Sequence, residues 1–175
     1  MEIMLSSAPG VIAALIGAYV SCRLSTQSAR ATEIGSIRRE AAADLCAPLR
    51  DLRTLARMWG RVETTQQDVA SSFAAWSEAI DRRAHLLPDE WAHLRRSVRA
   101  AIMTIFGGVA LSDIRPDERD AELTEPDFLW QDFADDYLTY VISGVARWGD
   151  DQRVPNRIHD FDSWLRVTGR AEIPA

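Results

Sequence analysis

Apolar residues recur at intervals of three and four along most of the chain, which is the period of a helix face buried against a core. The first stripe runs from Ile34 to Val62, and further stripes cover about 69–87, 91–105 and 128–148. A shorter apolar segment lies at 161–168. No stretch of useful length alternates with the period of a strand. We therefore expect an all-α fold, with an antiparallel bundle of about four helices and a short C-terminal helix.

Helix boundaries are marked by residues that favour helix ends. Thr64 or Thr65 begins the second helix, where Asp68 can complete a capping box. Pro48 lies inside the first stripe, so we expect a kink or a break there. Asp89 and Glu90 begin the third helix, Gly107-Gly108 ends it, and the fourth begins near Thr124 and ends at Gly149. The expected buried face of the fourth helix consists of Phe128, Leu129, Phe133, Tyr137, Val141, Val145 and Trp148.

The N-terminal region differs from the rest, because 20 consecutive residues from Ile3 to Cys22 carry no charge. A helix of about that length crosses a hydrocarbon layer of ~30 Å. The strongly apolar part, 11–20, is short for a span, so the segment from Ile3 to Ala8 has to be included. We predict a membrane anchor at 1–23, a juxtamembrane stalk at 24–33 and a helical domain at 34–175. A cleaved signal, a lipoprotein leader ending at Cys22 and a buried core helix remain alternatives.

Flanking charges predict the orientation of this anchor. Glu2 is the only charged side chain before the apolar stretch, whereas Arg23, Arg30, Arg38 and Arg39 follow it. A secretory signal has its positive region before the apolar run, and positive residues stay on the cytoplasmic side of a membrane span. We therefore expect the chain in the inner (plasma) membrane, with its N-terminus outside and its helical domain in the cytoplasm.

Small residues recur along one side of the predicted anchor, at Gly10, Ala13, Gly17 and Ser21. Small residues at such intervals allow two membrane helices to approach closely. This pattern predicts a helix–helix contact, so the expected partners are the lipid bilayer and either a second copy of the chain or another protein.

Charge is unevenly distributed and argues against nucleic acid as a partner. The chain has a net charge of −6, and from Ala100 onward 15 acidic residues face only 7 arginines. Such a surface repels phosphates. The connection at 109–125 is especially acidic.

Candidate chemistry is sparse, and no cofactor motif is present. Asp132, Asp135 and Asp136 share one face of the fourth helix, and carboxylates so placed are weak candidates for a Mg²⁺ site. Arg50, Arg53, Arg57 and Arg61 flank the apolar stripe of the first helix, and we expect them to pair locally with acids such as Asp51.

These observations favour a membrane-anchored, non-enzymatic helical protein with an interaction or regulatory role. One alternative is an effector that disrupts membranes by oligomerising through its single helix. The other is a small metal-dependent hydrolase that uses Asp132, Asp135 and Asp136.

Overall fold

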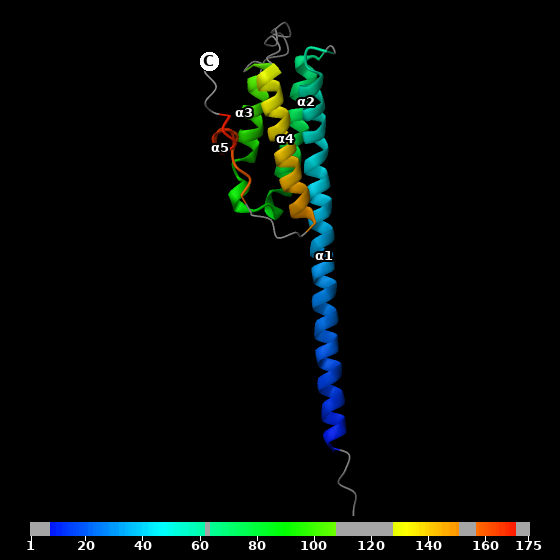
Figure 1. Cartoon of the computed structure of the whole chain (residues 1–175). Helices are drawn as coiled ribbons and strands as arrows, with labels where there is room; N and C mark the ends of the chain where they lie inside the picture. The colour runs from blue at the N-terminus through cyan, green and yellow to red at the C-terminus, as the bar shows by residue number, and fades with distance from the viewer. Residues whose placement is uncertain (1–7, 62–63, 108–127, 151–156, 171–175) are drawn as a thin grey trace, which may run out of the picture. The chain divides into compact units, whose positions relative to one another are not determined.

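The computed structural model describes residues 8–61, 64–107, 128–150 and 157–170, with only the backbone for 8–31 and 128. Within these ranges the chain is helical and has no strand, which confirms the all-α prediction. The helices are α1 (Ala8–Met58), α2 (Gln66–Arg83), α3 (Leu94–Phe106), α4 (Phe128–Gly149) and α5 (Phe161–Val167), as Figure 1 shows. Two short 3₁₀ segments, Ala84–Leu86 and Asp89–Trp91, connect α2 to α3.

The chain divides into two compact units, Met1–Ile37 and Arg38–Ala175. The predicted stalk, 24–33, is part of α1, which is one helix of 51 residues. The predicted break at Pro48 does not occur. Leu45, Leu49 and Leu52 stay in phase across Pro48 and are all buried. Their burial offsets the backbone hydrogen bond that a proline removes.

In the second unit, α1 and α4 pack antiparallel along their length. In successive contacts between the two helices, the residue number increases along α1 and decreases along α4. The two helices therefore run in opposite directions. The pairs are Ala42 with Gly149, Cys46 with Ile142, Arg53 with Asp135 and Ala56 with Gln131. Gly149 lets the helices approach, because a Cβ there would lie 2.5 Å from the Cβ of Ala42.

The other neighbouring helices are joined by polar and aromatic contacts. Arg83 near the end of α2 binds Asp44 and Glu40 of α1. Arg95 of α3 binds Asp81 and the carbonyl of Ser77 in α2. At the two ends of the α3–α4 pair, Trp91 packs on Trp148, and Phe106 packs on Trp59 beside the start of α4. The second unit is therefore an antiparallel four-helix bundle carrying α5, as the sequence predicts.

Most helix ends follow the predicted signals. Thr65 is the N-cap of α2, and its reciprocal bonds with Asp68 form the predicted capping box. Gly107 ends α3 with φ +80°, a conformation that glycine adopts at little cost. The start of α3 differs, because Asp89–Trp91 forms a 3₁₀ turn and the α-helix begins only at Leu94.

The expected buried face of α4 is confirmed at Phe133, Tyr137, Val141, Val145 and Trp148. Leu129 was expected in this face but is 43% exposed, so that assignment was wrong. Leu129 lies two residues before Gln131, whose side chain occupies the inward position of this turn instead. The side chain of Phe128 lies outside the described residues.

The transmembrane part of the fold prediction has no structural support. None of the helices in the described part of the chain is long and apolar enough to cross a membrane. The predicted span required Ile3 to Ala8, and residues 3–7 lie outside the described residues. The anchor therefore stays a prediction from sequence.

Candidate functional site

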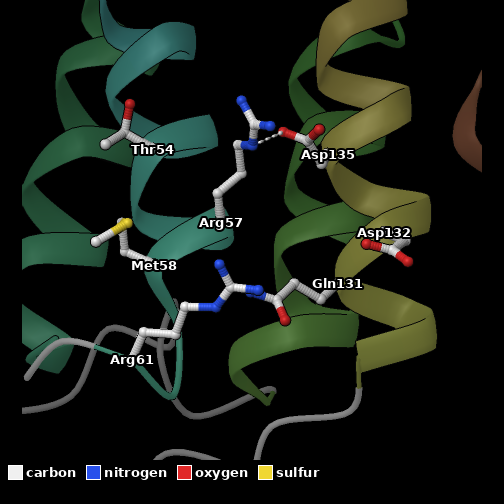
Figure 2. A pocket seen from close by; sticks show the side chains of 7 residues that line it. All are labelled: Thr54, Arg57, Met58, Arg61, Gln131, Asp132 and Asp135. Atoms are coloured by element: carbon white, nitrogen blue, oxygen red, sulfur yellow. Dashed lines mark ion pairs between the residues drawn. The ribbon is translucent and has the colours of Figure 1, made fainter.

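An open groove of about 630 Å³ lies between α1 and α4 in the second unit. Seven residues line it, as Figure 2 shows: Thr54, Arg57 and Met58 from α1, Arg61 from the turn after α1, and Gln131, Asp132 and Asp135 from α4. Thr54, Arg57 and Met58 are three and four residues apart, so they share one face of α1. That face is turned away from the leucine stripe, and these three side chains and that of Arg61 are exposed.

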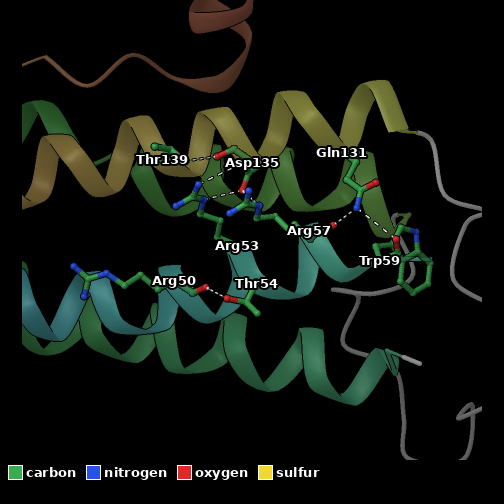
Figure 3. A network of polar contacts seen from close by, with 9 residues as sticks. Arg50, Arg53, Thr54, Arg57, Trp59, Gln131, Asp135 and Thr139 are labelled. Carbon is green, nitrogen blue, oxygen red and sulfur yellow. Dashed lines mark hydrogen bonds and ion pairs between the residues drawn. The ribbon is translucent and has the colours of Figure 1, made fainter. Parts of the chain in front are cut away.

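The groove is bordered by an ion pair that joins the two helices. Arg53 Nε donates to Asp135 Oδ1 at 2.7 Å, and a second guanidinium nitrogen donates to Oδ2 at 3.4 Å (Figure 3). Arg57 Nε lies 3.7 Å from the same Oδ1, too far for a hydrogen bond. The expectation that these arginines pair locally with Asp51 was therefore wrong for Arg53 and Arg57, which turn to α4.

Two charged side chains of the groove make no contact of this kind. Among the residues that the structure describes, the side chains of Arg61 and Asp132 form neither a hydrogen bond nor an ion pair. Figure 2 places the guanidinium of Arg61 beside the side chain of Gln131, with Asp132 at the edge farther from α1. The groove thus contains a cation and an anion that nothing within the described chain neutralises.

Gln131 lines the groove and binds carbonyls at the C-terminal end of α1. Its amide nitrogen donates to the carbonyls of Ala56 and Trp59, which lie in and just after the last turn of α1 (Figure 3). The last carbonyls of a helix have no partner within the helix, so a side chain from α4 supplies one here. Gln131 is only 5% exposed, so these bonds are formed away from water.

The three aspartates proposed as a metal site do not work together. Asp135 binds Arg53, Asp136 binds Arg170, and Asp132 is exposed at the groove edge. Two of the three carboxylates are thus already neutralised by arginine. Within the described ranges, no group of three or more His, Cys, Asp or Glu residues is placed to hold a metal ion. The geometry gives the hydrolase alternative no support.

A second polar cluster is buried where α5 joins α3 and α4. The Phe161 N–H donates to Ser97 Oγ at 2.6 Å, and Ser97 Oγ lies 2.5 Å from the Tyr137 hydroxyl. That hydroxyl donates to the carbonyl of His159 at 3.0 Å. Burial raises the pKa of Tyr137 well above its usual range, while the bond to Ser97 partly opposes this. The neutral phenol of Tyr137 thus anchors the segment before α5 by hydrogen bonds. A phenol that keeps its proton cannot act as a catalytic base.

The N-terminus of α5 is fixed by Asp160, which is its N-cap and accepts from the Ser163 N–H at 2.9 Å. This backbone hydrogen bond lowers the pKa of the Asp160 carboxyl. Cys46, in contrast, is a buried thiol whose pKa is raised by burial, with Arg50 acting in the opposite direction. Cys46 therefore lacks the features of a nucleophile, because reactive cysteines have lowered pKa values and are accessible.

The predicted helix–helix contact residues Gly10, Ala13, Gly17 and Ser21 belong to α1. Their side chains lie outside the described residues, so the contact remains a prediction.

Sequence reasoning missed Gln131 and Ser97, the two polar side chains that are buried in the described part of the chain. A signal for each was present. Ser97 falls in phase with Leu94 and Val98, and Gln131 falls in phase with Ala134 and Leu138. A polar residue at an inward position of an apolar stripe indicates a buried hydrogen bond, because an unpaired group there is costly.

Comparison with known proteins adds no family to this picture. The chain matches no protein-family model, no curated protein and no solved structure.

Proposed function

We propose that this protein is a membrane-anchored, non-enzymatic interaction protein, whose helical bundle binds a partner at the cytoplasmic face. The observation that supports the proposal is that the first unit has a single helix. Among the elements in the described ranges, the first unit contains only the first part of α1. A lone helix is marginally stable in water, and an apolar one needs lipid or another helix around it.

The sequence supports lipid as that environment. The charge-free stretch from Ile3 to Cys22 supplies the length of a span when residues 3–7 extend the helix that begins at Ala8. The arginines from Arg23 onward favour a cytoplasmic location for everything that follows. The small residues Gly10, Ala13, Gly17 and Ser21 would let two such helices associate within the bilayer.

The binding role is supported by exposed side chains that a partner could cover. Ile34 and Ile37 of α1, which were expected at the start of a buried face, are instead 54% and 39% exposed, so that assignment was wrong for these two residues. In the second unit, the groove between α1 and α4 presents unneutralised charge beside Met58, which is also exposed. Exposed apolar and charged groups in one place are typical of an interaction surface.

Fractionation of bacterial cells tests the anchor. The full chain should sediment with membranes and resist carbonate washing, whereas Leu15→Arg combined with Ile16→Arg should release it, because two charges are costly in hydrocarbon. The matched control is Ser25→Arg with Thr26→Arg, which adds the same charge outside the stretch. Release of the unmodified chain into the soluble fraction would refute the anchor. A C-terminal reporter active only in the periplasm would refute the orientation.

A further inference from the structure

The positive charge of the groove lies on the side of α1 and the turn after it. Arg57 and Arg61 line that side, Asp132 and Asp135 of α4 line the other, and Arg53 of α1 beside the groove binds Asp135. Asp135 is only 17% exposed, and both of its oxygens are engaged by Arg53. The guanidinium groups of Arg57 and Arg61 therefore have N–H donors that form no hydrogen bond with a described residue.

The chemistry of these two side chains defines what they would bind. A guanidinium presents its donors in a planar fork that matches the two oxygens of a carboxylate. Arg57 lies in the last turn of α1 and Arg61 follows its end, just after Gly60 with φ +76°, and both side chains line the same groove. Two acidic side chains at positions i and i+4 of a helix, or i and i+2 of an extended segment, lie on one face and can present a carboxylate to each arginine.

The remaining lining favours a peptide over a free metabolite. The groove is open and runs between two helices, and Met58, 39% exposed, offers an apolar contact beside the arginines. Asp132 at its edge would repel a further acid and would accept from a basic side chain. A segment of protein can present an acidic pair, an apolar residue and a neighbouring base together.

We infer that this groove binds an acidic segment of a partner protein, with Arg57 and Arg61 each taking one carboxylate of an acidic pair. The inference names the partner chemistry for the proposed interaction role and rests on that role, but it does not depend on the membrane anchor. Asp132 sets the sign of the charge next to the pair, so the preferred segment has a Lys or Arg beside its two acids.

Fluorescence polarisation with the full chain in detergent tests the inference. The probe is a labelled helical peptide with two Glu residues at i and i+4 and a Lys beside them, compared with the same peptide carrying Gln in place of Glu. We expect the Glu peptide to bind at least about tenfold more tightly. Arg57→Gln combined with Arg61→Gln should abolish that difference.

Two matched control variants distinguish the effect of the groove residues on binding from the effect of the protein's net charge. Arg96→Gln removes charge from an exposed arginine of α3 outside the groove and should change the affinity less than about twofold. Asp132→Asn should weaken the preference for the peptide with Lys over one with Ala at that position, whereas Asp51→Asn on the exposed side of α1 should not. The variants lie on the surface, and unchanged circular dichroism and thermal midpoints verify their folding.

Several outcomes would overturn the inference. These are equal binding of the Glu and Gln peptides, and equal weakening by Arg96→Gln and by the groove variants. Binding of phosphatidylglycerol vesicles or inorganic phosphate through Arg57 and Arg61, without binding of the peptide, would assign the groove to phosphate instead. If the chain proves soluble in cells but binds the peptide through the groove, the anchor fails and the inference stands. If it is membrane-bound but the peptide result fails, the inference alone falls.

Discussion

Asp135 of α4 accepts two hydrogen bonds from Arg53 of α1, a residue 82 positions earlier in the chain. Because both side chains are largely covered, this pair fixes which turn of α1 lies beside which turn of α4. Asp135→Asn should lower the free energy of unfolding by about 1–2 kcal/mol, between the values typical of exposed and buried pairs. Urea unfolding of the full chain measures this.

Asp132→Asn is the control for that change, since Asp132 lies one turn away on α4 and is exposed. It should alter the free energy of unfolding by less than about 0.5 kcal/mol. Equal losses from both substitutions would mean that the Arg53–Asp135 pair does not stabilise the bundle.

Gln131 should contribute to stability through the end of α1. Gln131→Met keeps the length of the side chain but leaves the carbonyls of Ala56 and Trp59 without this donor. We expect a loss of about 1–3 kcal/mol in the free energy of unfolding. Amide exchange should also become faster in the last turn of α1 than in its middle. Gln67→Met, at an exposed position of α2, should have little effect on either measurement.

Tyr137 should make the bundle sensitive to alkali. Its pKa is raised by burial, so the folded protein keeps the phenol proton that an unfolded chain loses at about pH 10. The stabilisation is therefore complete below about pH 10 and is lost as the pH rises above it. Between pH 10 and 11, the free energy of unfolding should fall more steeply for the unmodified chain than for Tyr137→Phe. Parallel curves would contradict this.

Gly149 and Gly35 should respond to alanine in opposite directions. A Cβ on Gly149 would meet the Cβ of Ala42 at 2.5 Å, so Gly149→Ala should force α1 and α4 apart and cost about 1–3 kcal/mol. Gly35 has no atom within 4 Å of an added Cβ, so Gly35→Ala should gain up to about 1 kcal/mol from helix propensity. Thermal midpoints of the two variants test this, and an unchanged or raised midpoint for Gly149→Ala would contradict the close approach.

The sequence predicted the helices well because their signals are local. The apolar period located α2, α3 and α5, and single residues such as Thr65 and Gly107 marked their ends. The sequence left open whether Pro48 kinks or breaks the first helix, because the outcome depends on what Leu45 and Leu49 pack against. Leu129 was misplaced for a related reason, since an apolar side chain near a helix end need not face the core.

The groove could not be predicted in the same way, although its charged residues had been noticed. The arginines of α1 and the aspartates of α4 were each recognised as charged helix faces. Pairing them requires the register of two helices that are far apart in sequence, and no local pattern encodes that register. Arg53 was therefore expected to pair on its own helix, and Asp135 was considered for a metal.

The antiparallel contact between α1 and α4 also has a consequence for synthesis of the chain. Gln131 is added 75 residues after Ala56, which at about 5–20 residues per second takes roughly 4–15 s. Throughout that interval the side of α1 that will face α4, including Ala42 and Cys46, is without its final neighbour. The bundle therefore cannot close until α4 has been synthesised, and until then this side of α1 has no helix packed against it.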